Sequence, residues 1–432
     1  MQSKTSPWLW VPTLYFAEGL PYFIVNVISV TMFKRLGMSN GDITLYTSLL
    51  YLPWTIKPFW SPFVDIIRTK RWWIVSMQVV MAAATLLLCL SLPHPGPEQI
   101  QAGLGVSPFV LTLILFYLTA FASATHDIAA DGYYMIALDE HRQSLFVGIR
   151  STFYRIASVF GQGVLVVIAG VLETRTGDIP RAWSLTLFSC AILLAAITLY
   201  HSLILPRAEF SSEKKSASSI ARDLLDAFAS FFRKDGVWLA IVFMLLYRLP
   251  EAFSVKMLTP FLLDSAQDGG LGLSTSQCGL VYGTVGTVAL TAGGILGGLA
   301  AGRWGLRKSL WPMSLSLALP CAVYLYMALA QPSNMPTIYF CVALDQFGYG
   351  FGFTAYMLYM MWFSQGRFKT SHYAICTAFM ALSMMIPGIF AGWLQEALGY
   401  TGFFIIVMIC CLATVFVTFA VRKRIDSQYG KK

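Results

Sequence analysis

Charged residues are scarce in this sequence, and their scarcity excludes a water-soluble protein. Asp, Glu, Lys and Arg make up 12% of the 432 residues, and hydrophobic residues make up 57%. Soluble domains contain about 25% charged and roughly 45–50% apolar residues. The sequence also lacks metal-ligand spacings, loop cysteines suited to disulfides, and a glycine-rich loop ending in Lys that would hold a nucleotide phosphate. We therefore predict no metal ion and no cofactor, and interpret the eight cysteines as packing residues.

Long apolar runs are abundant instead. Each of twelve runs is long enough to cross the ~30 Å hydrocarbon core of a bilayer as a helix, which satisfies its own backbone hydrogen bonds there. The expected spans are residues 8–33, 42–64, 72–92, 107–138, 143–172, 183–205, 237–263, 277–301, 309–331, 336–363, 372–396 and 401–421. The first run is too long for a signal peptide and lacks a cleavage site, so we expect it to remain as a span.

The basic residues follow the topology of these spans. Of the thirty Lys and Arg, 21 lie in loops on the side of the N-terminus, four on the opposite side and five within spans. Because cytoplasmic loops carry the excess of basic residues, we expect both termini in the cytoplasm of a multi-pass protein of the bacterial inner membrane. The formal charge of +9 therefore indicates topology and not nucleic-acid binding.

Traces of a duplication connect the two halves of the chain. Leu36–Asp42, after the first span, matches Leu271–Gln277, after the seventh. The segment 61–71 matches 298–308, which resembles the loop signature G-x3-D-R-x-G-x-R-R of the major facilitator superfamily. This resemblance implies an all-α integral membrane protein with twelve transmembrane helices in two six-helix bundles. The expected bundles are residues 1–205 and 237–432, with a cytoplasmic central loop of residues 206–236.

Ionisable residues within the spans are the candidate functional groups, because a charge at bilayer depth costs about 3 kcal/mol on insertion scales. They are absent from spans three, six, nine and twelve, which the superfamily resemblance places outermost. We expect them to face a shared aqueous chamber that opens to alternate sides of the membrane. The ten residues are Glu18, Lys57, Asp127, Asp131, Arg150, Arg155, Arg248, Glu251, Lys256 and Asp345.

Depth and helical spacing predict which charges of the first half meet. Glu18, Asp127 and Arg155 each lie about 15–18 Å from the cytoplasmic end of their spans, so a cluster near the midplane is expected. Asp127 and Asp131 share one helical face. Proton-driven transport requires a carboxylate that gains and loses a proton, and Glu18, Asp127 and Asp131 fit that role. A structural ion pair is the alternative interpretation.

Three further features have two interpretations each. Arg248 and Glu251, three residues apart, are spaced to pair within the seventh span, either for transport or for structure. His126 faces away from Asp127, which favours a hydrogen-bonded packing role over titration. Tyrosines on the expected chamber helices suit sugar rings but are also common packing residues: Tyr15, Tyr22, Tyr247, Tyr349 and Tyr356.

Four segments of the first half carry motifs of one family. Tyr15–Pro21 is similar to F-A-S-G-L-P, and Ile56–Asp65 to F-K-F-L-W-[SA]-P-L-x-D. Ala122–Tyr133 is similar to S-A-S-Q-D-I-x-x-D-A-[WY], and Tyr154–Gly163 to G-Y-R-x-G-x-x-x-x-G. Together they resemble the AmpG-type muropeptide permeases. The resemblance implies proton-driven import of anhydro-muropeptides, N-acetylglucosaminyl-anhydro-N-acetylmuramic acid with or without peptide, for cell-wall recycling. By position it assigns roles to Lys57, Asp127, Asp131 and Arg155.

Two departures from that family bear on the substrate. Glu18 stands where the family has a small polar residue, and Tyr134–Ile136 replaces its K/R-T-D. An amino-sugar, a smaller anhydro-sugar or a siderophore is therefore the alternative substrate of a transporter of this fold.

Two other classes of protein fit the sequence less well. An intramembrane transferase would need His126 and Asp127 as a catalytic pair, but no nucleophile has an activating partner at helical spacing. A membrane sensor would need a signalling domain, and the expected loops and termini are short. We therefore expect a monomeric transporter, not an enzyme, whose partners are a small-molecule substrate, protons and the lipid bilayer.

Overall fold

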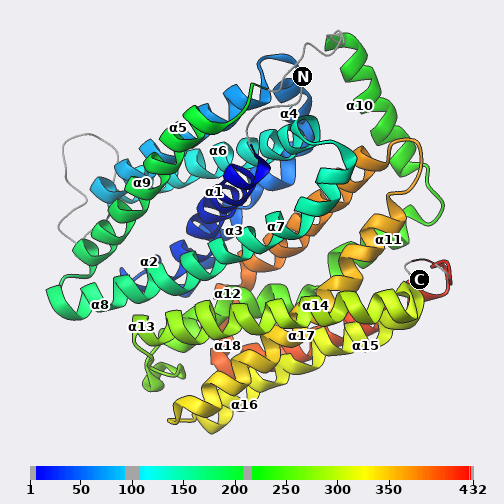
Figure 1. Ribbon diagram of the computed structural model, residues 1–432. Helices are drawn as coiled ribbons and strands as arrows, with labels where there is room; N and C mark the ends of the chain where they lie inside the picture. The colour runs from blue at the N-terminus through cyan, green and yellow to red at the C-terminus, as the bar shows by residue number, and fades with distance from the viewer. Residues whose placement is uncertain (1–5, 93–107, 208–216, 428, 430–432) are drawn as a thin grey trace. The chain divides into compact units, whose positions relative to one another are not determined.

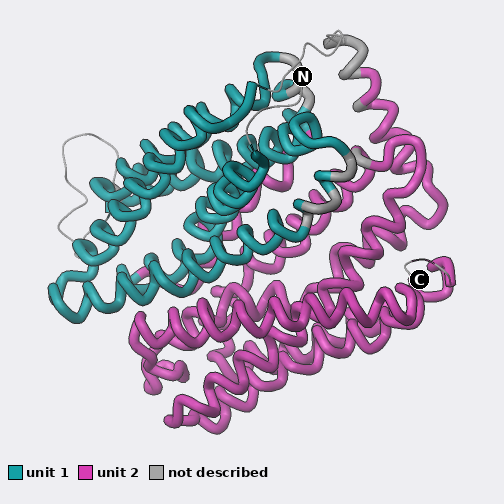
Figure 2. The backbone as a smooth tube through the Cα atoms, in the orientation of Figure 1, with its two compact units in different colours: residues 1–37, 59–221 teal, residues 38–58, 222–432 magenta. Residues whose placement is uncertain are grey.

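The computed structural model describes residues 6–92, 108–207, 217–427 and 429. Within these ranges all regular secondary structure is helical (Figure 1). The backbone groups into two compact units, residues 1–37 with 59–221 and residues 38–58 with 222–432 (Figure 2). Lys214 and Lys215 of the expected central loop lie outside the described residues.

Unit 1 contains the helices of the first half, with the exception of α3 and the start of α4. Two of its long helices change to wider π-helical turns within the span, at η2 and η4. The elements are η1 (Pro7–Leu9), α1 (Val11–Phe23), η2 (Ile24–Ile28), α2 (Ser29–Arg35), α5 (Lys70–Ser91), α6 (Pro108–Ala137), α7 (Glu140–Ser158), η4 (Val159–Leu165), α8 (Val166–Thr176) and α9 (Ile179–Ile204).

Unit 2 contains the helices of the second half together with α3 (Asn40–Leu49). The helix α4 (Leu52–Ile66) begins in unit 2 and ends in unit 1. The helix α10 (Ala217–Phe232) also begins in unit 1 and continues in unit 2 from Arg222. The other elements are α11 (Val237–Leu246), α12 (Leu249–Leu263), η5 (Ala266–Asp268), α13 (Thr275–Cys278), η6 (Gly279–Gly286), α14 (Thr287–Trp304), α15 (Leu306–Ala318), η7 (Leu319–Cys321), α16 (Ala322–Ala330), α17 (Met335–Phe363) and α18 (Lys369–Arg422).

The twelve expected spans are present as helices. Among the described residues, nine segments are long and apolar enough to cross a membrane. The last of them, Ser371–Arg422, supplies two spans, because Gly399 breaks α18 with φ 67° and ψ 173°. The helix α17, of 29 residues, and the pair of α3 and α4 supply the remaining two. The all-helical fold is therefore confirmed, with span boundaries within a few residues of those predicted.

The expected central loop contains a helix that the span analysis did not predict. α10 lies within residues 206–236 and carries apolar and polar residues on opposite faces. The expected division into 1–205, 206–236 and 237–432 concerns the order of the halves along the chain and stays a prediction. The grouping by contacts differs from it at residues 38–58, which pack within unit 2.

The first duplicated segment has the same local structure in both copies. Gly37 and Gly272 adopt positive φ values of 85° and 65°, where glycine is unstrained. Two residues later a serine caps the next helix: Ser39 accepts a hydrogen bond from the backbone of Asp42, and Ser274 accepts one from Gln277. The repeated L-G-x-S pattern therefore ends one span and starts the next.

Close helix packing in unit 2 depends on glycine. A Cβ atom on Gly293 of α14 would lie 2.1 Å from the backbone oxygen of Phe347, and one on Gly350 of α17 would lie 2.0 Å from that of Leu290. No side chain fits at either position, so the backbones of α14 and α17 are in direct contact. Gly293 and Gly350 thus serve close packing of these two helices.

Candidate functional site

Unit 1 holds an ion-pair cluster centred on Arg150 of α7. The Arg150 Nη2 atom lies 2.8 Å from Asp131 Oδ1 on α6, and the Tyr15 hydroxyl of α1 donates to the same carboxylate at 3.0 Å. The guanidinium also lies over the Tyr15 ring, 4.4 Å from its centroid. Three helices therefore converge on one charge pair, which we name the Arg150 cluster.

Other predicted residues surround this cluster. Glu18 and Asp127 are near enough to act electrostatically on Arg150. Glu18 is buried, with 8% exposure, whereas Asp127 is half-buried. Arg155 lies five residues after Arg150 on the same helix and is half-buried. The ion pair that the structure shows here joins Arg150 to Asp131, and the expected meeting of Glu18, Asp127 and Arg155 stays a prediction.

The Arg150 cluster is open on one side. The Asp131 side chain is 42% exposed and that of Arg150 is 30% exposed. Both belong to helices that cross the membrane, and a charge pair left that open to lipid would be costly. The pair is therefore partly accessible from outside the unit.

One of the two departures from the permease motif lies in the cluster, and the other lies beside it. The Tyr134 ring centroid lies 5.4 Å from the Arg150 guanidinium and 5.8 Å from the Tyr15 ring. The Tyr134 hydroxyl donates to the backbone oxygen of Gln143, which fixes the ring. Glu18, the second departure, acts electrostatically on both Tyr15 and Arg150.

Unit 2 holds a second, closed ion pair. Arg248 Nε lies 2.6 Å from Glu251 Oε2, as the spacing predicts, and a second bond of 2.9 Å joins the other ends of the two groups. The guanidinium also donates to the Tyr349 hydroxyl at 2.9 Å. Its faces lie near three aromatic rings, those of Tyr349, Phe353 and Tyr356.

A break in the seventh span positions this pair. α11 ends at Leu246, and Arg248 has the non-helical values φ −102° and ψ 11° before α12 begins. Pro250 in the first turn of α12 suits such a start. Proline has no backbone N–H, and the N–H groups of a first turn have no partner within the helix. Discontinuous spans are the usual place for substrate and ion sites in transporters of duplicated architecture.

Asp345 of α17 is a buried carboxylate of a different kind. It is 7% exposed and accepts hydrogen bonds from the Tyr324 hydroxyl at 2.6 Å and from Gln346 Nε2 at 3.1 Å. Among the described residues it belongs to no ion pair. A carboxyl group in this position is suited to gain and lose a proton.

The remaining predicted residues are described one by one. Lys57 of α4 is half-buried, and Tyr22 of α1 packs its ring against that of Phe23 at 5.3 Å. His126 is fully buried and lies 2.9 Å from the Gln78 amide, which also contacts His201. This bears out the hydrogen-bonded packing role expected for His126.

Two of the ten charges within the spans, Arg150 and Lys256, were given no specific role from the sequence. Arg150 was recognised as an intramembrane charge but was not expected at the centre of the cluster. Lys256 of α12 was also recognised and omitted, yet it is 2% exposed. The only indication of Lys256 in the sequence was a basic residue within the seventh span, five residues after Glu251.

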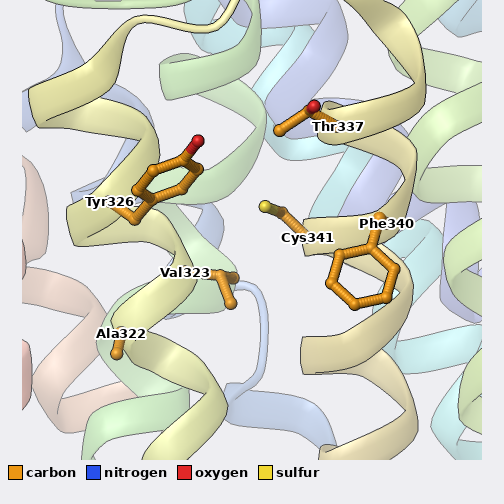
Figure 3. A pocket seen from close by; sticks show the side chains of 6 residues that line it. All are labelled: Ala322, Val323, Tyr326, Thr337, Phe340 and Cys341. Atoms are coloured by element: carbon orange, nitrogen blue, oxygen red, sulfur yellow. The ribbon is translucent and has the colours of Figure 1, made fainter.

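A pocket of about 460 Å³ lies away from these charges. It lies between α16 and α17, and its lining is mostly apolar (Figure 3). Tyr326 and Phe340 at this pocket are more than half exposed, as expected for side chains that face lipid. The pocket therefore belongs to the outer surface and not to the candidate site. Among the described residues no group of three metal-ligating side chains is present.

The chain combines membrane-spanning helices, a duplicated segment and ion pairs within its spans. The profile of the Major Facilitator Superfamily matches residues 13–364. The chain therefore belongs to this superfamily, and it is a multi-pass membrane transporter, not an enzyme.

Curated relatives cover almost the full chain at low identity. The putative transporter AmpG 4 of Rickettsia felis is 24% identical over 422 residues, which span 96% of each chain. The anhydromuropeptide permease of Escherichia coli K12 is 23% identical over 401 residues, 91% of this chain and 75% of the relative.

Solved structures show the same fold. A bacterial homologue of the human lysosomal transporter Spinster, inward-facing and unoccupied, matches with a TM-score of 0.75 and 13% identity over 96% of both chains. A D-xylose-proton symporter matches with a TM-score of 0.71 and 14% identity over 98% of both chains. At this identity the likeness concerns the fold alone.

Proposed function

We propose that this protein is a proton-driven importer of anhydro-muropeptides, carrying GlcNAc-anhydroMurNAc with or without peptide from periplasm to cytoplasm. It would lie in the bacterial inner membrane as a monomer with both termini in the cytoplasm. The observation that carries the substrate class is the similarity, over 91% of this chain and 75% of the relative, to an anhydromuropeptide permease. The four matching segments of the first half support it.

The charged clusters supply the chemistry that this substrate needs. Muropeptides carry carboxylates and sugar rings, and an arginine flanked by tyrosines binds both, through charge and through ring stacking. Arg150 with Tyr15 and Tyr134 offers this combination in a partly open site. Arg248 with Tyr349 offers it at the break of the seventh span.

Proton coupling would use the carboxylates. Asp127 and Asp131 lie at the open cluster, where entry of a proton changes the charge that faces the substrate. Asp345 is hydrogen-bonded by two neutral donors, so its charge is not fixed by a cation among the described residues. Alternating exposure of such groups to the two sides of the membrane couples proton and substrate movement.

A second candidate substrate is an amine-bearing sugar. Glu18 adds an acid beside the Arg150 cluster, where the permease motif has a small polar residue. An additional carboxylate favours a cationic substrate group and repels an anionic one. An amino-sugar is therefore the alternative to test in parallel.

Uptake into proteoliposomes tests both candidates. Labelled anhydro-disaccharide and labelled amino-sugar are offered with and without an inward proton gradient. The proposal predicts accumulation of the anhydro-disaccharide only with the gradient. Equal uptake with and without the gradient would reject proton coupling. Uptake of the amino-sugar alone would reject the anhydro-muropeptide as substrate in favour of the amino-sugar.

A further inference from the structure

Lys256 is a buried lysine without a carboxylate partner among the described residues. Its side chain on α12 is 2% exposed, and none of the ion pairs in the described part of the chain includes it. The amino group donates to Thr47 Oγ1 at 3.2 Å and lies 4.8 Å from the centroid of the Tyr51 ring. Both partners belong to segment 38–58.

The surroundings of Lys256 are tightly packed. A Cβ atom on Gly388 of α18 would lie 3.2 Å from the Lys256 Cε atom and 2.4 Å from Ser48 Oγ. Ser48 is fully buried, and its hydroxyl has no hydrogen-bond partner in the described residues. We call Lys256, Thr47, Ser48, Tyr51 and Gly388 the Lys256 junction.

The same segment is attached to unit 2 along its length. The Asn40 side chain at the start of α3 donates to Gln395 at 2.7 Å and to the Tyr400 hydroxyl at 3.2 Å. The backbone amide of Gly392 donates to Thr44 at 2.9 Å. Segment 38–58 is joined by the chain to unit 1 at both ends, yet it packs against α12 and α18.

Few charged or titratable groups can compensate Lys256. From the segment, Tyr51 contacts it with its ring face. Glu396 of α18 accepts from the backbone of Gly41, and Glu251 of α12 is paired with Arg248. Nothing titratable on the other elements packed against α12, which are α13, α15 and η7, forms an ion pair or hydrogen bond with Lys256 in the described residues.

The charged form of Lys256 is therefore poorly stabilised while the junction is closed. An ammonium group has three donors, and one of them is used here. The contact with the Tyr51 ring offsets only part of the cost of burying an ion. A neutral amine fits the closed junction better. If segment 38–58 moves away, water reaches the amine and favours its protonated form.

We propose that Lys256 is a proton-sensing positioning residue that controls the attachment of segment 38–58 to α12 and α18. The amine is neutral in the closed junction and takes a proton from water when the junction separates. Because the separated state binds one more proton, a falling pH favours separation and a rising pH favours closure. The use of this switch in transport rests on the proposed proton coupling, but the switch itself requires no muropeptide.

Thiol labelling at Ser48 tests the switch without a transport assay. Ser48→Cys adds a buried thiol at the junction and breaks no hydrogen bond, because the Ser48 hydroxyl has no partner in the described residues. Its labelling by a small maleimide is measured between pH 6 and 9 with Lys256, with Lys256→Met and with Lys256→Arg, and the parent protein corrects for the native thiols. The reaction of a thiol with maleimide itself depends on pH. Dividing each labelling rate by the rate for Lys256→Met at the same pH removes this dependence.

The three backgrounds have different expected outcomes. With Lys256, the corrected labelling rises as pH falls, by up to about tenfold per pH unit, since one proton is linked. Lys256→Met labels slowly at every pH, and Lys256→Arg labels rapidly at every pH because its charge is permanent. The same pH profile for Lys256 and Lys256→Met would overturn the proposal.

Two controls keep the test decisive. Size-exclusion profile and melting temperature in detergent show whether each variant is folded, and Lys256→Gln replaces Lys256→Met if the latter is not. A pH-dependent junction in a protein that transports no muropeptide would reject the proposed substrate and leave the switch standing. Muropeptide uptake by a protein whose Lys256 junction does not respond to pH would reject the switch and leave the proposed substrate standing.

Discussion

Arg248 and Glu251 form a two-point ion pair at the start of α12, with distances of 2.6 and 2.9 Å. Their side chains are only 5% and 6% exposed. The Arg150 and Asp131 side chains, by contrast, are 30% and 42% exposed. The two ion pairs should therefore respond differently to substitution, because an uncompensated charge costs more where water is absent.

Removing one partner of the closed pair should destabilise the protein. Glu251→Gln leaves the Arg248 charge buried beside aromatic rings, and loss of one partner of a buried pair costs about 3–5 kcal/mol. We expect a clearly lower melting temperature in detergent. The double variant Arg248→Met with Glu251→Leu should recover most of that loss, since no isolated charge remains.

Transport by the double variant separates structure from function. If the pair binds substrate or proton, the stable double variant should still lose uptake into proteoliposomes. Uptake at the level of the unaltered protein would assign the pair a structural role alone.

Removing the Asp131 charge should affect transport more than stability. The ion pair with Arg150 is partly exposed, and such pairs contribute about 0–1 kcal/mol. We expect Asp131→Asn to melt within a few degrees of the unaltered protein but to lose most gradient-driven uptake. Arg424→Gln, which breaks an exposed ion pair with Asp235, is the matched control and should change neither property. A large loss of stability in Asp131→Asn would point to a structural ion pair.

The spans were predictable because their signal is one of composition. Twelve apolar runs and the L-G-x-S repeat define helix positions, and the positive φ of Gly37 and Gly272 explains why that repeat ends a span. The helix α10 was missed because it is amphipathic and shorter than a span, so its apolar face does not form a long run.

The partners in the site were only partly predictable. The Arg248 and Glu251 pair follows from spacing on one helix. The Arg150 cluster joins three helices, and depth along a span does not determine which side of a helix faces the others. Depth favoured Arg155, and it gave no signal for the ion pair of Arg150 with Asp131. The contact between Lys256 and Thr47 joins residues 209 positions apart, which no local pattern reveals.

Asp127→Asn should separate accumulation from exchange. The substitution keeps the size of the side chain but removes its charge and its ability to carry a proton. We expect loss of gradient-driven accumulation, with exchange of labelled for unlabelled anhydro-disaccharide at least partly retained. Asp345→Asn is measured in parallel, because Asp345 is the buried carboxyl without a cation partner in the described residues. Full accumulation by either variant would show that the aspartate replaced in it does not carry the coupling proton.

Glu18→Ser should discriminate between the two candidate substrates. The change restores the small polar residue of the permease motif and removes an acid that acts on Arg150. Without that acid, the positive charge of Arg150 is less compensated and attracts an anionic substrate more strongly. We expect uptake of anhydro-disaccharide with a peptide to be maintained or increased, and uptake of an amino-sugar to decrease.

The measurement for Glu18→Ser is the ratio of the two initial uptake rates in the same proteoliposomes, which cancels differences in the amount of reconstituted protein. Glu173→Gln is a control for loss of an acid elsewhere in unit 1, where the carboxylate binds Arg35. A fall in muropeptide uptake with Glu18→Ser would mean that Glu18 serves transport of the anionic substrate directly, as an acceptor of its hydroxyl groups or of the proton.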